Sequence, residues 1–258
     1  MAHLLRTTTL LVTLLLGLSP AGAQSYTQTS VPYSYDDPTL LGSPPLVLTD
    51  ESFVTVALPA PFPFYGVQYS SISISDNGGI RFGNNLIIDP QNNCIPSASP
   101  GGDPDIALYW DDLVPGPNTE VYFSGASSPN RFLVTFVDIE HGQASGGGTA
   151  TFQLALFPSG ALEIRHQQAL FGDPLLDDGA SATIGIQNVV GNTHGTGDFL
   201  QASCNVPVST TNTATQFCDP ADADADGFSM CTGDCDDSDP TRAPDLTEIC
   251  DAIDQDCD

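Results

Sequence analysis

Alternating aspartates near the C-terminus are the residues of this sequence best suited to bind a ligand. The stretch DADADGF places Asp222, Asp224 and Asp226 at the first, third and fifth positions of a loop, and Gly227 at the sixth. Short loops wrap oxygen ligands around Ca²⁺ with this spacing, and the backbone carbonyl of the seventh residue, here Phe228, is a further ligand. Because carboxylates this close repel one another, a divalent cation would stabilise a compact form of the segment. The pattern therefore predicts a calcium site.

The carboxylate that would complete this site comes a few residues later. The loop is not a full EF-hand, because its twelfth position is Gly233 instead of glutamate and no helical pattern flanks it. Asp234 and Asp237 follow directly. We expect one of them to supply the closing ligand.

A second copy of the alternating pattern stands at the end of the sequence. The stretch DQDCD places Asp254, Asp256 and Asp258 at the first, third and fifth positions again, and the sequence stops where the next glycine is expected. We therefore expect residues 218–258 to form an acidic, cysteine-containing metal-binding repeat region that is cut inside a repeat. The odd number of cysteines, seven, agrees with a partner beyond the end, but a free thiol or a bond to another chain would also explain it.

The ligand types favour calcium over softer metals. From Cys218 onward there is no histidine, and Met230 is the only thioether. Copper and zinc prefer imidazole and sulfur, whereas carboxylate and carbonyl oxygens suit calcium. Thiolates could bind copper or zinc, but cysteines of an exported chain form disulfides more readily. A disordered, solvated acidic tail is the alternative without a metal, and the regular spacing argues against it.

The overall charge limits the partners. The 258 residues carry a formal net charge of −27, with only five basic side chains, all of them arginines. Nucleic acids and anionic membrane surfaces are excluded, since both require a cationic footprint on the protein. Divalent cations are the natural partners of such a chain.

Residues 1–23 have the three-part pattern of a secretory signal peptide. The positive segment MAHLLR precedes a short apolar run and the small residues AGA, which predict cleavage after Ala23. No second long apolar segment follows, so we expect no transmembrane span and a protein that is secreted or held at the cell surface. In that setting cysteines predict disulfides, and Cys94 and Cys204, which have no near neighbours in sequence, are expected to pair.

Residues 24–205 are predicted to form an antiparallel β-sandwich, followed by a Thr-rich linker at 206–217. Phe152, Leu154 and Leu156 alternate with smaller or polar residues, as in a strand with one buried face. Turn sequences such as DNGG and PSG separate the strands. The clearest strand runs are SISIS (71–75), GIRFG (79–83), IALYW (106–110), EVYFS (120–124), RFLVTFVDIE (131–140), TFQLALF (151–157), ALEIRH (161–166) and ATIGIQ (182–187). Many short strands without an amphipathic helix indicate an all-β fold.

An enzymatic site is the main competing interpretation. Asp111 and Asp112 follow Trp110 at a strand end, and together with His141 they could serve a secreted hydrolase or an accessory module of one. No H-E-x-x-H or G-x-S-x-G motif supports this. Aspartates at strand ends are ordinary turn residues, and Trp110 is expected in the sandwich core. Convergence of the two aspartates and the histidine in one concave pocket would favour an enzyme.

Two stretches resemble known families. The segment 219–258, DPADADADGFSMCTGDCDDSDP and onward to DAIDQDCD, resembles the metal-binding repeat of MopE-type surface proteins in the order and spacing of acids, cysteines and prolines. It is more loosely similar to thrombospondin type 3 calcium repeats, and it departs from the family pattern at Ala225 and Asp245. Residues 50–190, which include FPFYGVQYSSISISDNGGIRFG, resemble β-sandwich modules of large secreted bacterial proteins and the nidogen-like extracellular domain.

These resemblances imply a structural or adhesive role and a metal-binding tail. Together with the residue patterns they lead to the expectation of a non-enzymatic, calcium-binding surface protein. Its further partner would be an extracellular protein or a polysaccharide. Capture of copper or zinc, as the MopE name suggests, is the alternative for the tail.

Overall fold

The structure is a computed structural model that describes residues 25–83, 88–97, 103–127, 130–188, 199–249 and 253–257. The expected signal peptide and the expected ligand Asp258 lie outside the described residues, as does Cys250.

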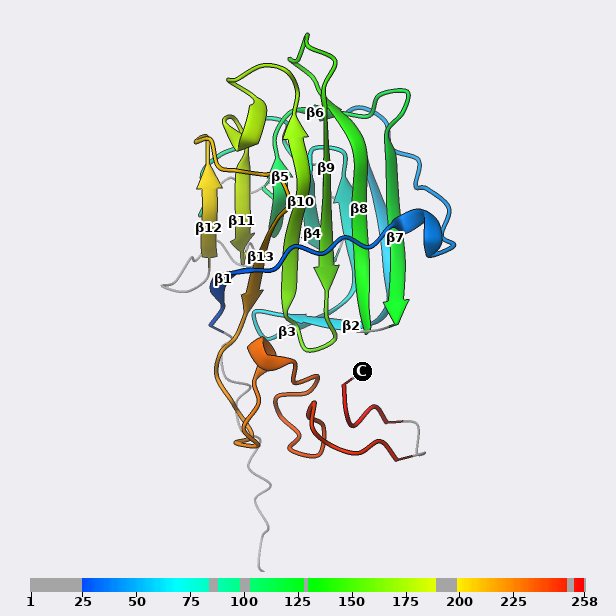
Figure 1. Ribbon diagram of the computed structural model, residues 1–258, viewed down its shortest axis with the longest axis vertical. Helices are drawn as coiled ribbons and strands as arrows, with labels where there is room; N and C mark the ends of the chain where they lie inside the picture. Colours follow the sequence, from blue (N-terminus) through cyan, green and yellow to red (C-terminus); the bar gives the residue numbers. More distant parts are fainter. Residues whose placement is uncertain are drawn as a thin grey trace, which may run out of the picture.

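Two antiparallel sheets form a sandwich, as the sequence predicts (Figure 1). Sheet A has the order β1 (Thr27–Val31), β13 (Thr213–Cys218), β10 (Leu162–Leu170), β9 (Thr149–Leu156), β8 (Asn130–His141) and β6 (Leu113–Val114), and β7 (Glu120–Ser127) also pairs with β8. Sheet B has the order β12 (Phe199–Cys204), β11 (Thr183–Gln187), β5 (Ile106–Trp110), β4 (Gly79–Phe82), β3 (Val67–Ser75) and β2 (Phe53–Phe64). The described helical segments are single 3₁₀ turns: η1 (Pro38–Leu40), η2 (Asp177–Gly179) and η3 (Met230–Thr232).

The main core lies between the two sheets. Ile72 and Ile74 of β3 and Phe152 and Leu154 of β9 are fully buried in one apolar cluster. Their spacing of two residues places them on the inner faces of the pleated strands. The DNGG turn before β4 is also confirmed: Gly78 has φ 68°, and a Cβ at this position would lie 2.1 Å from the carbonyl oxygen of Tyr109. Only glycine fits there.

The outer face of sheet A is also covered, which the sequence pattern did not predict. Residues 32–37, which we call the N-terminal strap, run across this face after β1 (Figure 1). Gln153 of β9 points outward and donates a hydrogen bond from Nε2 to the backbone oxygen of Asp36 (2.9 Å). Gln153 is therefore fully buried, and β9 is buried on both faces instead of one.

A smaller cluster lies on the outer side of sheet B. The predicted Cys94–Cys204 disulfide is present and ties the loop around Cys94 to the end of β12. Trp110 packs with Ile88 and Ile95 of this loop, and its Nε1 donates to the carbonyl oxygen of Asp89. The expectation that Trp110 lies in the main sandwich core is wrong, because its side chain faces the opposite side of the sheet.

The predicted linker at 206–217 contains a strand of the sandwich. Residues Thr213–Cys218 form β13, which pairs antiparallel with both β1 and β10. Ala214 and Phe217 are buried, while the polar residues between them are only partly buried. The strand lacks large apolar residues at every second position, and for this reason the sequence pattern did not reveal it.

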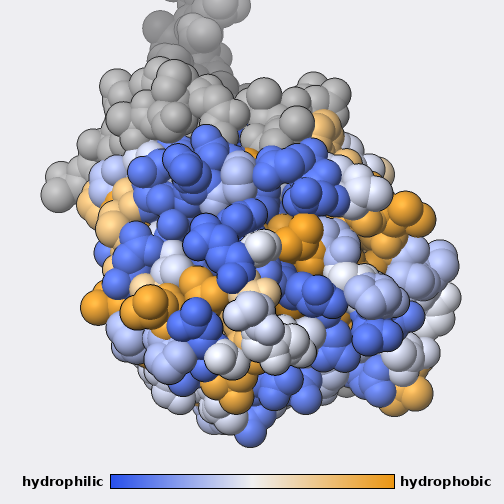
Figure 2. Space-filling view, turned by 90° about the horizontal axis from the view of Figure 1, so that it is seen from above, coloured by the Kyte–Doolittle hydropathy of each residue, from blue (hydrophilic) through white to orange (hydrophobic). Residues whose placement is uncertain are grey.

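In the described part of the chain, no helix has the length and apolarity needed to span a bilayer. Figure 2 shows the upper end of the sandwich, where hydrophilic residues dominate and hydrophobic residues occur in scattered groups. Scattered exposed apolar residues of this kind are normal for a folded domain.

Candidate metal centre

The first acidic loop folds around its own aspartates. Asp222 accepts hydrogen bonds from the backbone N–H of Ala225 (2.7 Å) and of Gly227 (3.0 Å), and Asp226 accepts one from the N–H of Phe228 (2.8 Å). Gly227 has φ 102°, a conformation that favours glycine. The carboxylate oxygens of Asp222, Asp224 and Asp226 come within 4.8 Å of one another. The alternate spacing thus brings these three predicted ligands together.

Several carboxylate oxygens of this loop lack a partner. Asp224, Asp226 and Asp234 each accept a backbone N–H with one oxygen, at 3.2, 2.8 and 2.8 Å. The second oxygen of each is buried and has no hydrogen-bond partner. Buried carboxylate oxygens are costly unless they are paired or bind a metal. These three oxygens therefore fit a bound cation.

The two candidates for the closing ligand differ in their surroundings. Asp234 is fully buried, and its burial, followed by the charges of Asp226 and Asp237, raises its pKa to about 6. Asp237 accepts the N–H of Ala223 (3.1 Å), and burial raises its pKa as well. Both residues thus lie beside the first loop, although neither belongs to the set of three within 4.8 Å. Asp234 has the unpartnered oxygen and fits the role of closing ligand better.

A second cluster joins Asp254 and Asp256 with Glu248, whose carboxylate oxygens also lie within 4.8 Å of one another. Glu248 accepts the N–H of Gln255 (2.9 Å), and Asp254 accepts that of Cys257 (2.9 Å). Asp256 Oδ1 is buried without a hydrogen-bond partner. Glu248 was missed because only the alternating aspartates were considered.

A disulfide and an arginine hold the two acidic loops together. Cys235 bonds to Cys257, which connects the end of the first loop to the second cluster. Arg242 donates from Nη1 to Asp236 (2.9 Å) and from Nε to the carbonyl oxygen of Asp254 (3.1 Å). A cross-link of this span stabilises the folded form by about 3 kcal/mol in the chain-entropy model.

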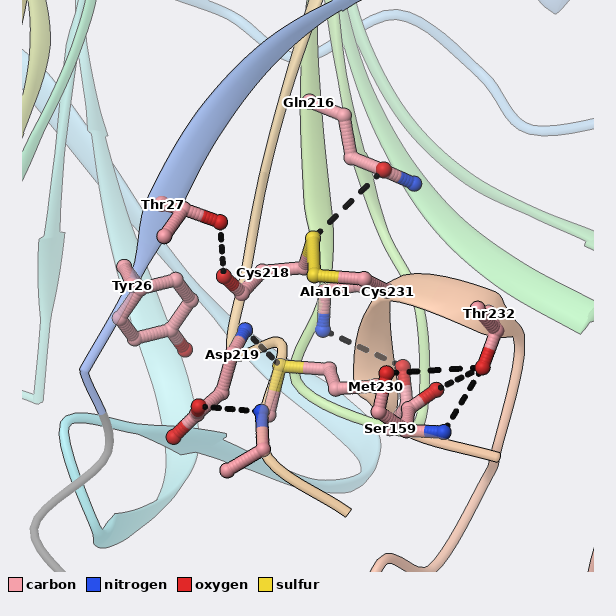
Figure 3. The surroundings of a disulfide bond; sticks show 12 residues. Tyr26, Thr27, Ser159, Ala161, Gln216, Cys218, Asp219, Met230, Cys231 and Thr232 are labelled. Carbon is pink, nitrogen blue, oxygen red and sulfur yellow. Dashed lines mark hydrogen bonds between the residues drawn. A yellow bond between two sulfur atoms is a disulfide. The ribbon is translucent and has the colours of Figure 1, made fainter. Parts of the chain in front are cut away.

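The first loop is anchored to the sandwich at a second disulfide, Cys218–Cys231 (Figure 3). Beside it, the side chain of Met230 is buried in the main core, and its Sδ accepts the N–H of Asp219. Asp219 in turn accepts the N–H of Ser25 (2.9 Å). The start of the tail is therefore continuous with the sandwich core.

The donor atoms in both clusters are hard oxygens. The thioether of Met230 is committed to the core, and the described cysteines of the tail are joined in disulfides. Carboxylate oxygens without soft ligands suit a hard divalent cation such as Ca²⁺. The residues present therefore fit calcium better than copper.

The residues of the enzymatic interpretation do not form an open site. His141 Nε2 lies 3.1 Å from Asp111 Oδ2, and both side chains are buried. Ser181 donates its hydroxyl to the same oxygen of Asp111 (2.5 Å), whereas in a catalytic triad the serine must contact the histidine. The other ring nitrogen of His141 accepts the backbone N–H of Gln143 (3.1 Å). Asp112 lies beside Gly142. Two cavities are formed between the sandwich and the tail, and none of these residues lines either of them.

Two family models match the chain. Residues 234–258 match a model described as "Putative metal-binding motif", which is named for copper-binding MopE. This match includes Asp234, Asp237 and the second cluster, whereas the first loop precedes it. Residues 25–230 match the model described as "NIDO related". No curated protein and no solved structure matches the chain. Since the larger match covers the whole sandwich and the start of the tail, the chain belongs to the NIDO-related family.

Proposed function

We propose that this protein is a secreted or cell-surface structural and adhesive module, without enzymatic activity, whose acidic tail binds Ca²⁺. The observation that carries the proposal is the set of buried, unpartnered carboxylate oxygens of Asp224, Asp226, Asp234 and Asp256. Four such oxygens in one short tail are costly without a cation. A bound divalent ion would offset this cost at both clusters.

The ligands proposed for the first site are the carboxylates of Asp222, Asp224, Asp226 and Asp234, with the backbone carbonyl of Phe228. Asp237 would contribute charge beside this site. The second site would use Glu248, Asp254 and Asp256, to which Asp258 is added by the repeated spacing. When bound, the ion would supply positive charge and a fixed oxygen coordination, and thus order the tail.

Export is supported by the bonding state of the cysteines. Three disulfides, Cys94–Cys204, Cys218–Cys231 and Cys235–Cys257, are expected of a protein in an oxidising compartment. The N-terminal signal pattern agrees with this location. The buried state of Asp111 and His141 supports a non-enzymatic role.

Calorimetry on the chain that begins at Gln24 would test the calcium site, with Mg²⁺ and Cu²⁺ as competing ions. We expect two Ca²⁺ per chain, weaker binding of Mg²⁺ and no tighter binding of Cu²⁺. The double substitution Asp224→Asn and Asp226→Asn should remove one of the two sites. Asp245→Asn removes an exposed charge from the same tail and should leave both sites intact.

Calcium should also stabilise the folded tail. A ligand at a hundredfold excess over its Kd stabilises the state that binds it by about 2.7 kcal/mol. Tight Cu²⁺ binding that survives chelation of Ca²⁺, or equal loss of binding in the double variant and in Asp245→Asn, would contradict the proposal.

A further inference from the structure

A cavity of about 640 Å³ lies where the sandwich, the N-terminal strap and the tail meet. We call it the junction cavity. Asp36 of the strap, Arg131 and Arg165 of sheet A, and Met230 and Asp254 of the tail are among its lining residues. Its volume is in the range of small-molecule sites, roughly 300–1,000 Å³. Asp254 belongs both to this lining and to the second carboxylate cluster.

Fixed ion pairs form the polar wall of the junction cavity. Asp36 binds the guanidinium groups of both Arg131 and Arg165, and Arg165 also binds Glu163 at 2.6 Å. Both arginines are more than nine-tenths buried. Their positions are therefore set before any ligand arrives.

The charge balance of this wall argues against an anionic ligand. Three lining carboxylates, those of Asp36, Glu163 and Asp254, stand against two guanidinium groups. Each arginine already has a carboxylate partner. Phosphate, sulfate or carboxylate groups need an uncompensated cation, and this wall does not offer one.

The remaining lining offers hydrogen-bond donors and acceptors as well as apolar surface. Asn130 and Gln216 present amides, which both donate and accept hydrogen bonds. Pro32, Phe157 and Pro158 add apolar area to the lining. A sugar ring has matching chemistry, because its hydroxyl groups donate and accept while its C–H faces are apolar.

We propose that the junction cavity binds a neutral saccharide, and that cation binding in the tail controls this binding because the tail forms one wall of the cavity. The second part rests on the proposed calcium site. It follows from the position of Asp254, together with Cys235 and Cys257, on the tail side of the lining. A tail without its cation would leave this wall unformed.

The test uses the chain that begins at Gln24, loaded with calcium, on an array of neutral, sulfated and sialylated oligosaccharides and lysine-rich peptides. Calorimetry then measures the affinity of the best neutral saccharide. The double variant Asn130→Ala with Gln216→Ala should bind it at least tenfold more weakly. Gln167→Ala changes an exposed residue of β10 outside the lining and should bind normally. Chelation of calcium should abolish binding, and unchanged thermal unfolding would show that the variants are folded.

Each outcome decides between the two proposals. Binding only of anionic glycans or of cationic peptides, no binding at all, or equal affinity in the double variant would overturn the saccharide site, even if calcium binds as proposed. Saccharide binding that survives chelation would overturn the cation control while the cavity assignment stands. If calorimetry detects no calcium but the variants still weaken saccharide binding, the calcium proposal fails and the cavity site remains.

Discussion

Asp36 should contribute more to stability than any other residue of the strap, because it forms ion pairs with two buried guanidinium groups. Arg131 and Arg165 both bind its carboxylate. Asp36→Asn removes this charge. Arg165 keeps its ion pair with Glu163 and its hydrogen bond to Gln153, whereas Arg131 loses its ion pair with Asp36. Breaking a buried ion pair from one side costs about 3–5 kcal/mol.

The lower end of this range applies here, since the side chain of Asp36 is 20% exposed and Arg165 keeps its ion pair with Glu163. We therefore expect a loss of about 3 kcal/mol in the free energy of unfolding, or a decrease in Tm of about 6–12 °C for a domain of this size. Urea unfolding followed by circular dichroism would measure it. Asp37→Asn is the matched control, because asparagine can still cap the η1 turn.

The same residue should produce an acid-dependent effect. Burial raises the pKa of Asp36, but the hydrogen bonds and charges of Arg131 and Arg165 outweigh burial and bring it below 3.8. A lowered folded-state pKa gives stability that is present above pH 3.8 and is lost as the pH falls through the folded-state value. The difference between the wild type and Asp36→Asn should therefore shrink in acid. A loss below about 1 kcal/mol at neutral pH, or a difference that stays constant in acid, would refute this account of the network.

Three further predictions concern the core and the tail. Burial lowers the pKa of His166 from 6.5 to about 4. The free energy of unfolding should therefore fall by about 3 kcal/mol as the pH drops from the first value to the second. His166→Gln should flatten this part of the pH dependence, which urea unfolding at a series of pH values would measure. In Gly227→Ala, the added Cβ has no neighbouring atom within 4 Å, but the backbone is strained because φ is 102°. Calorimetry should show roughly tenfold weaker Ca²⁺ binding, and an unchanged affinity would argue against the loop geometry. Cys235→Ser with Cys257→Ser removes a cross-link worth about 3 kcal/mol, and should weaken the second calcium site more than the first in the same assay.

The local parts of the candidate site were predictable from the sequence. Asp222, Asp224 and Asp226 are neighbours in the chain, and their spacing alone brings their carboxylates within 4.8 Å. The all-β fold was predictable for the same reason, since inward residues such as Ile72 and Ile74 of β3 alternate regularly.

Apart from the Cys94–Cys204 disulfide, contacts between distant residues were not predictable. Asp36 is 95 residues from Arg131 and 129 from Arg165, so no local pattern could relate them. β13 was missed because Phe217 is its one large apolar residue, so it shows no alternating pattern, and its pairing with both β1 and β10 is not visible in the sequence. The burial of Gln153 likewise depends on the strap, which crosses the sheet from another part of the sequence.

The tail depends on cross-links and cations because it buries little apolar surface of its own. Its large apolar residues Leu246, Ile249 and Ile253 are 36%, 61% and 49% exposed. Among the described side chains beyond β13, Met230 is the one that belongs to the main core, next to the Cys218–Cys231 disulfide. Burial therefore anchors the first loop, whereas the second cluster is held by Cys235–Cys257, Arg242 and the proposed cation. Removal of calcium should consequently loosen the second cluster first and leave the unfolding of the sandwich unchanged, because no described strand of either sheet pairs with that end of the described tail.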